Sequence, residues 1–338
     1  MLNAGYMDAR KIEQFAGRLF MKDVLFIKTS SLGDVIHHMP ALTEARAKLP
    51  DARFSWVVEE AFAPLVRLHP AVEHVIPVAT RRWRQTPWRP STWAQVLAFR
   101  RGLRARRFDE IVDSQGLLKS ALIARYAQGR RRGYDRNSIK EPAASWFYDI
   151  KHPIGWNQHA IARNRALTAE ALGYTCEGPP DFGLDRESLR VRSEKPYGVL
   201  LHATAQASKE WPEENWRMLA AVLGSSDFDL VALHGNDTER ERAEHIAAAA
   251  PRVRVPERQP LDQVARLIAG ASFVAGVDTG LLHLAAALGV PLVAIFLGSE
   301  PGLTGPMGQG PIEVRGAKGA PPSVAEVADT VRRLVELK

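Results

Sequence analysis

The stretch from Val24 to Pro40 constrains the fold of this chain more than any other part of it. Its first residues, Val24 to Ile27, form an unbroken β-prone apolar run, which is typical of a strand buried on both faces. A small polar turn, Thr29 to Gly33, comes next, and apolar residues then recur at helical spacing. The pattern predicts a strand, a short turn and a helix, and open α/β sheets bind their ligands at such strand ends.

The same alternation of strand and helix patterns continues along the rest of the chain. Strands connected by helices in this way form parallel sheets with helices on both faces, so the sequence predicts an α/β fold. The length of 338 residues fits two domains better than one. Further strands are expected at 54–58, 75–78, 110–113, 197–201, 230–233, 272–277 and 291–297.

A segment rich in Gly, Pro and charge, residues 177–196, is the best candidate for a linker between two domains. It would separate a first domain over residues 21–176 from a second domain over residues 197–320. Residues 321–338 begin with two prolines and continue with a helical pattern. We expect this last helix to pack back on the first domain.

The N-terminus and the cysteine content bear on the compartment. Asp8, Lys11 and Glu13 interrupt any apolar core of a signal peptide, so residues 1–20 are interpreted as an extension outside the fold. The single cysteine, Cys176, excludes an internal disulfide. A reducing compartment is the natural inference.

Positive charge is concentrated in the first half of the chain. Residues 1–176 carry 28 Lys and Arg against 16 Asp and Glu, whereas the remainder carries 17 against 22. This asymmetry indicates an anionic partner for the first half. Arg81, Arg82 and Arg84 stand together in a Trp- and Pro-containing stretch, 81–90, that is predicted to be a loop. Guanidinium groups of this kind suit phosphate or carboxylate groups on a ligand.

Two turns in the first half bring polar side chains to one edge of the predicted sheet. Asp34 lies near the start of the first helix, where it can either cap the helix or act on a ligand. A second strand–turn–helix unit, residues 110–120, would place Gln115 and Lys119 at the same edge. The residues alone leave both roles of Asp34 open.

Two turns in the second half have the form of anion sites. Lys209 stands just before a helix that begins at Pro212, where a cation gains nothing from the helix dipole, so its position suggests a bound anion. An exposed lysine without a ligand is the alternative. Residues 276–283 form a strand, an Asp-Thr-Gly turn and a helix, and the amides after Asp278 would point at a phosphate. Asp278 could instead be an N-cap, and His283 could belong to the core.

Five motifs in combination closely resemble the lipopolysaccharide heptosyltransferases, a family of ADP-heptose-dependent glycosyltransferases. The resemblance covers about residues 22–337, and the arginine-rich motif favours the members that add the first heptose over those that add the second. It implies a GT-B fold, in which two Rossmann-like doubly wound parallel-sheet domains face a central cleft. The motifs are Lys28–His37, Arg81–Arg84, Asp113–Ser120, Lys209–Glu214 and Asp278–His283.

The resemblance implies transfer of L-glycero-D-manno-heptose from ADP-heptose to Kdo of Kdo2-lipid A in the biosynthesis of the lipopolysaccharide inner core. The reaction would invert the anomeric centre and need neither a metal nor a cofactor. Asp34 would be the general base, and Lys209 would stabilise the departing diphosphate. The implied donor-binding residues are Thr204, Lys209, Glu239, Asp278, Thr279, Gly280 and His283, and the implied acceptor-binding residues are Ser31, Gly33, Arg81, Arg82, Arg84, Gln115 and Lys119.

The chain also departs from the family pattern, and two other functions remain open. Ala205 and Leu282 stand where Thr and Ser are common. The resemblance implies a cytoplasmic protein, peripheral on the cytoplasmic face of the inner membrane, with a monomer expected and no nucleic acid as partner. One alternative is a nucleotide-sugar epimerase of GT-B fold, which leaves the Arg81–Arg84 motif unexplained. The other is a non-enzymatic nucleic-acid or polyanion-binding protein, which the basic half suggests but no recognition motif supports.

Overall fold

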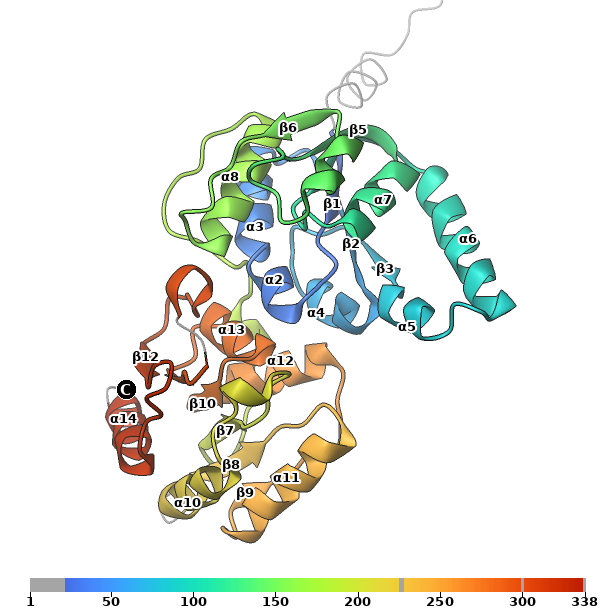
Figure 1. Cartoon of the computed structure of the whole chain (residues 1–338). Coiled ribbons are helices and arrows are strands. Elements are labelled where there is room, and N and C mark those ends of the chain that lie inside the picture. The colour runs from blue at the N-terminus through green and yellow to red at the C-terminus, as the bar shows by residue number, and fades with distance from the viewer. Residues whose placement is uncertain (1–21, 225–227, 299–300, 337–338) are drawn as a thin grey trace, which may run out of the picture.

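The computed structural model describes residues 22–224, 228–298 and 301–336. The predicted N-terminal extension, residues 1–20, lies outside these ranges. The described chain forms two halves, each built on a parallel six-stranded sheet that is covered by helices (Figure 1).

The first sheet has the strand order β3-β2-β1-β4-β5-β6. Its centre is β1, whose apolar run pairs with β2 on one side and β4 on the other. The chain order reverses between β1 and β4, which makes the carboxyl ends of these strands the topological switch point of the sheet. The strands are β1 (Asp23–Ile27), β2 (Arg53–Glu59), β3 (His74–Val78), β4 (Arg107–Asp113), β5 (Gln128–Tyr134) and β6 (Ile150–His152).

The second sheet repeats this topology. Its order is β12-β11-β10-β7-β8-β9, so the chain order reverses between β7 and β10. Read from β9, this is the same order as in the first sheet, which is that of dinucleotide-binding domains. The strands are β7 (Tyr197–Leu201), β8 (Asp229–Ala232), β9 (Val253–Arg254), β10 (Phe273–Val277), β11 (Leu292–Ile295) and β12 (Ile312–Arg315).

Helices connect the strands and cover both sheets (Figure 1). In the first half they are α2 (Leu32–Ile36), α3 (Met39–Lys48), α4 (Ala63–Val66), α5 (Thr80–Gln85), α6 (Pro90–Arg104), α7 (Leu118–Tyr126) and α8 (Ala160–Leu172), with 3-10 turns η1 (Glu60–Phe62) and η2 (Pro142–Phe147). In the second half they are α9 (Arg186–Leu189), α10 (Glu213–Gly224), α11 (Asp237–Ala248), α12 (Leu261–Gly270), α13 (Gly280–Ala287) and α14 (Val324–Glu336), with η3 (Ala207–Lys209) and η4 (Gly302–Thr304).

The two halves contact each other through pairs of helices. α2 packs against α13, α4 against α12, and α8 against η4. Buried apolar side chains of both halves belong to one continuous cluster. The carboxyl ends of β1 and β4 therefore lie near those of β7 and β10, across the junction.

The C-terminal helix differs from its prediction. α14 packs on its own half, against α10, β10, β11 and β12. Its residues Val327, Val331 and Leu334 are buried in one cluster with Trp211 and Trp216. The expectation that this helix packs back on the first domain is wrong, because the second sheet covers its apolar face.

Two arginine-rich stretches of the first half form regular secondary structure. The predicted loop at 81–90 begins as the helix α5, and Arg81 to Arg84 lie on it. Residues 128–134 form the strand β5, where Arg130 and Arg132 both pair with Glu110.

Among the described residues, no helix combines the length and the apolar character that crossing a membrane requires.

Candidate active site

The turn after β1 is fixed by side chains that follow β4. Gln115 accepts hydrogen bonds through Oε1 from the amides of Thr29 (2.9 Å) and Ser30 (3.0 Å). Lys119 donates from Nζ to Ser30 Oγ at 2.8 Å. The buried Lys28 donates to the carbonyl oxygen of Ser114 at 2.7 Å, and burial lowers its pKa. Gln115 and Lys119 thus reach the predicted edge, and both hold the turn that leads to Asp34.

Asp34 divides its two carboxylate oxygens between two surroundings. Oδ2 accepts hydrogen bonds from the amide of Ser31 (2.8 Å) and from Ser31 Oγ (3.1 Å), which makes Asp34 part of a capping box at the start of α2. Oδ1 has no hydrogen bond to any described residue. The capping role is therefore present, and one oxygen is left for another partner.

A pair of buried histidines joins the two halves beside Asp34. His37 Nε2 lies 3.2 Å from His283 Nδ1, so one ring donates to the other. Burial lowers the pKa of His37 to about 2 and that of His283 to about 4. Both rings are therefore neutral at pH 7. His283 also borders Gly33, where a methyl group would lie 3.1 Å from its ring.

Lys209 and Asp278 form an ion pair at the switch point of the second sheet. Lys209 Nζ lies 2.6 Å from Asp278 Oδ2, and both side chains are about one-fifth exposed. Thr204 donates from Oγ1 to the carbonyl oxygen of Asp278 at 2.9 Å. Asp278 is not the N-cap of α13, since Thr279 occupies that position. The partner of Lys209 inside this protein is thus the aspartate of the Asp-Thr-Gly turn.

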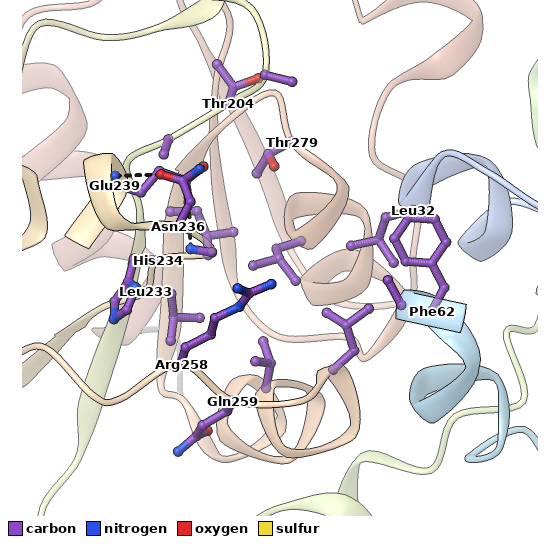
Figure 2. A pocket seen from close by; sticks show the side chains of 18 of the residues that line it. Leu32, Phe62, Thr204, Leu233, His234, Asn236, Glu239, Arg258, Gln259 and Thr279 are labelled. Atoms are coloured by element: carbon purple, nitrogen blue, oxygen red, sulfur yellow. Dashed lines mark hydrogen bonds between the residues drawn. The ribbon is translucent and has the colours of Figure 1, made fainter. Parts of the chain in front are cut away.

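A cleft of about 1290 Å³ opens between the halves next to this pair. From the first half it is lined by Leu32, Phe62 and Arg81, and Figure 2 shows Leu32 and Phe62 facing the residues of the second half. Thr204, Glu239 and Thr279 line the opposite wall. Lys209, Asp278 and Gly280 are not in its lining but are next to lining residues in sequence, and Asp34 and His283 are two residues from the lining residues Leu32 and Leu281.

Glu239 is held at the N-terminus of α11. Its Oε2 accepts from the amide of Gly235 at 2.6 Å, and its Oε1 accepts from Asn236 Nδ2 at 2.8 Å. Asn236 caps the helix in return, through its Oδ1 and the amide of Glu239. The carboxylate is fixed at the cleft wall, as Figure 2 shows.

Arg258 is a cleft residue that the sequence reading missed. It lies in the connection before α12, and Figure 2 shows its guanidinium group pointing into the cleft between Asn236 and Gln259. It forms no ion pair with a described residue. The nearby connection also contributes Leu233 and His234. No local motif marks this arginine, because an isolated Arg in a polar connection has no distinctive spacing.

The predicted acceptor-binding arginines have different surroundings. Arg82 pairs with Glu60 through both ends of its guanidinium group, at 2.9 Å each. Arg81 places its guanidinium 5.0 Å above the ring of Phe62. Burial lowers the pKa of Lys119, and the positive charges of Arg84 and Arg81 lower it further. The structure thus brings Lys119, Arg81 and Arg84 together, and it gives Arg82 a partner within the chain.

The close approach of α2 and α13 gives a first testable prediction. A methyl group at Gly280 would lie 2.7 Å from Leu32 Cβ, so Gly280→Ala is expected to lower the free energy of unfolding by about 1–3 kcal/mol. Leu32→Ala in the same chain removes Cγ and Cδ2, which would lie 2.8 and 2.9 Å from the added methyl group, and should restore part of the loss. As a control, Gly102→Ala in α6 has open space and should stabilise by about 0.5–1 kcal/mol. Urea unfolding measures all of these, and a fully stable Gly280→Ala variant would contradict the contact.

Comparisons with known proteins agree with this geometry. A family model described as glycosyltransferase family 9 (heptosyltransferase) matches residues 96–329. The chain is 45% identical over 295 residues to lipopolysaccharide heptosyltransferase 1 of Pseudomonas aeruginosa, which covers 86% of this chain and 83% of that one. The structure of E. coli heptosyltransferase WaaC with ADP superposes with a TM-score of 0.86 at 41% identity, covering 93% of this chain and 99% of that one.

A second structure of the E. coli protein, with ADP-2-deoxy-2-fluoro heptose, superposes with a TM-score of 0.83 at 40% identity and the same coverage. The predicted GT-B arrangement of two parallel-sheet halves is confirmed by these matches and by the strand order. The resemblance seen in the five sequence motifs is confirmed as well. The chain belongs to glycosyltransferase family 9, the heptosyltransferases.

Proposed function

We propose that this protein transfers L-glycero-D-manno-heptose from ADP-heptose to Kdo of Kdo2-lipid A and inverts the anomeric centre. The observation that carries the proposal is the cleft between the two halves, with the turn of Asp34 next to its first-half lining residue Leu32 and Lys209 next to its second-half lining residue Glu210. Two relatives support the proposal: the Pseudomonas aeruginosa protein is named lipopolysaccharide heptosyltransferase 1, and the E. coli protein is solved with ADP-2-deoxy-2-fluoro heptose.

The second half supplies the donor site in this proposal. The amides that begin α13, at Thr279 and Gly280, would bind the diphosphate, because a helix N-terminus offers free N–H groups to an anion. Arg258, which lines the same half of the cleft, would add a positive charge. Glu239, fixed by its own hydrogen bonds, is suited to accept hydroxyl hydrogen bonds from a sugar. Thr204 and His283 would complete the site next to Asp278.

Asp34 and Lys209 would carry the chemistry. Asp34 Oδ1 would take the proton of the attacking acceptor hydroxyl, whose oxygen forms the new bond to the anomeric carbon. The bond from that carbon to the diphosphate breaks on the opposite face, and ADP departs with the electron pair. Lys209 would stabilise the negative charge that develops on this leaving group. Protein cations can fill this role, and the proposal includes no metal or cofactor.

The first half would bind the acceptor. Arg81, Arg84 and Lys119 form a positive surface on the same side of the cleft as Asp34, and Kdo carries a carboxylate that these cationic groups attract. Ser31 and Gly33 border the approach to Asp34. A lipid acceptor would place the protein at the cytoplasmic face of the inner membrane.

Release of ADP from ADP-heptose, measured with and without deacylated Kdo2-lipid A, tests the function directly. We expect ADP release that depends on the acceptor, together with a new heptosylated product. Isomerised nucleotide sugar without an acceptor would support the epimerase alternative. No reaction, combined with salt-dependent binding of DNA, would support the polyanion-binding alternative.

A further inference from the structure

Large apolar side chains are exposed on a set of neighbouring elements in the first half. Trp88, in the turn before α6, is 74% exposed, and Trp93 on α6 is 60% exposed. Leu97 follows Trp93 one helical turn later and is also exposed. Leu118 and Leu122 are exposed one turn apart on α7, which contacts α6. Exposed apolar surface of this extent on adjacent elements is typical of an interaction site.

The same surface carries positive charge that is mostly uncompensated, although Arg82, next to it on α5, pairs with Glu60. From Thr80 to Phe108 the chain contains nine arginines and no Asp or Glu. Arg84, Arg89, Arg101 and Arg104 form no ion pair with any described residue. By contrast, Arg130 and Arg132 on β5 both pair with Glu110. Unpaired arginines beside exposed tryptophans therefore distinguish this surface from the other basic cluster of the first half.

Hydrogen bonds hold Trp93 and the turn that carries Trp88 in place. Trp93 donates from Nε1 to the carbonyl oxygen of Pro87 at 2.8 Å. Thr92 donates from Oγ1 to the carbonyl oxygen of Thr86 at 2.8 Å. These bonds fix the turn between α5 and α6 on the start of α6. The tryptophans are thus presented by an ordered surface, and ring systems with one polar end favour the boundary between water and lipid.

We propose that this surface, formed by residues 86–104 with the exposed side of α7, docks on an anionic lipid bilayer. Trp88, Trp93 and Leu97 enter the region between headgroups and acyl chains, and the unpaired arginines contact anionic headgroups. The inference rests on the proposed function, since an acylated acceptor is held in a bilayer. Figure 1 shows α6 on the outer side of the first half and α5, which carries Arg81, at the border toward the second half. Docking by α6 therefore brings the membrane close to the acceptor side of the cleft.

Sedimentation of the full chain with phosphatidylcholine vesicles, with and without phosphatidylglycerol, tests the docking. The wild type is expected to bind the anionic vesicles alone. Trp88→Ser/Trp93→Ser/Leu97→Ser should lower this binding by about tenfold or more. Arg89→Gln/Arg101→Gln/Arg104→Gln should lower it by roughly fivefold for each lost charge. The control Met218→Ser removes an exposed apolar side chain from α10 in the second half and should bind as the wild type does.

Activity measurements separate docking from the proposed function. The apolar triple variant should keep the wild-type kcat/KM with a deacylated, water-soluble acceptor and lose it with Kdo2-lipid A in vesicles. If the wild type turns over no acceptor while the triple variants still bind vesicles more weakly than it does, docking would be supported and the proposed function overturned. Equal binding of neutral and anionic vesicles, or unchanged binding by both triple variants at unchanged melting temperatures, would overturn the docking surface.

Discussion

Replacing Asp34 by asparagine is expected to lower kcat of heptose transfer by roughly 10²- to 10⁴-fold, the usual contribution of general acid–base catalysis. An asparagine side chain keeps an oxygen that can accept the hydrogen bonds now made by the amide and hydroxyl of Ser31. It cannot take a proton from the acceptor at neutral pH. ADP affinity should stay unchanged, because Asp34 lies on the first half and the proposed donor site on the second.

The two roles of Asp34 are separated by comparing asparagine with alanine. Asp34→Ala removes both the base and the carboxylate of the capping box, so it should lose turnover as Asp34→Asn does and also lose stability by roughly 0.5–2 kcal/mol. Single-turnover rates, ADP titration and thermal unfolding of the three proteins give all the needed values. Near-normal turnover by the asparagine variant would leave Asp34 with its capping role alone.

The sequence was sufficient to predict which turns meet at the junction. Parallel strands bring all their carboxyl ends to one edge, so the turns holding Asp34 and Lys119 had to be neighbours once their strands were recognised. The same argument applies to Thr204 and Asp278 in the second half. Apolar runs and turn residues are local signals, and the rule that joins them depends only on topology.

The partners of individual charged side chains could not be predicted in this way. Lys209 was expected to face an anion from a ligand, and the structure pairs it with Asp278, 69 residues away in the chain. Arg82 likewise pairs with Glu60. Local patterns specify which elements form, whereas these pairs depend on how two separate elements approach. Arg258 was not predicted as a site residue for the same reason, since only its position in the cleft indicates a role.

The local structure of the arginine-rich residues 81–84 was predicted incorrectly. Residues 81–84 were expected in a loop because of their charge and the prolines after them, yet they form the helix α5. Arginine is a good helix former, and the prolines lie beyond the end of the helix, with Pro90 at the first position of the next one. The packing of α14 was misjudged because an amphipathic pattern shows that a helix has an apolar face without showing which surface covers it.

Replacing Lys209 by methionine is expected to lower kcat/KM by roughly 10²- to 10³-fold, the usual cost of losing a group that stabilises developing negative charge. The loss has two sources in this protein. One is the missing positive charge at the diphosphate. The other is Asp278, whose largely buried carboxylate is 2.6 Å from Lys209 Nζ and would lose this cation while lying next to the incoming anion.

The contribution of the Asp278 carboxylate to this loss can be removed separately. Adding Asp278→Asn to Lys209→Met takes away the repelling charge, so the double variant should bind ADP about tenfold more tightly than Lys209→Met alone, as expected for directly contacting residues. Asp278→Asn alone frees the lysine and should weaken ADP binding little. ADP titrations and kcat/KM for the four proteins complete the cycle. Purely additive effects of the two substitutions would mean that the ion pair and the diphosphate do not compete for Lys209, and the proposed leaving-group role would then fail.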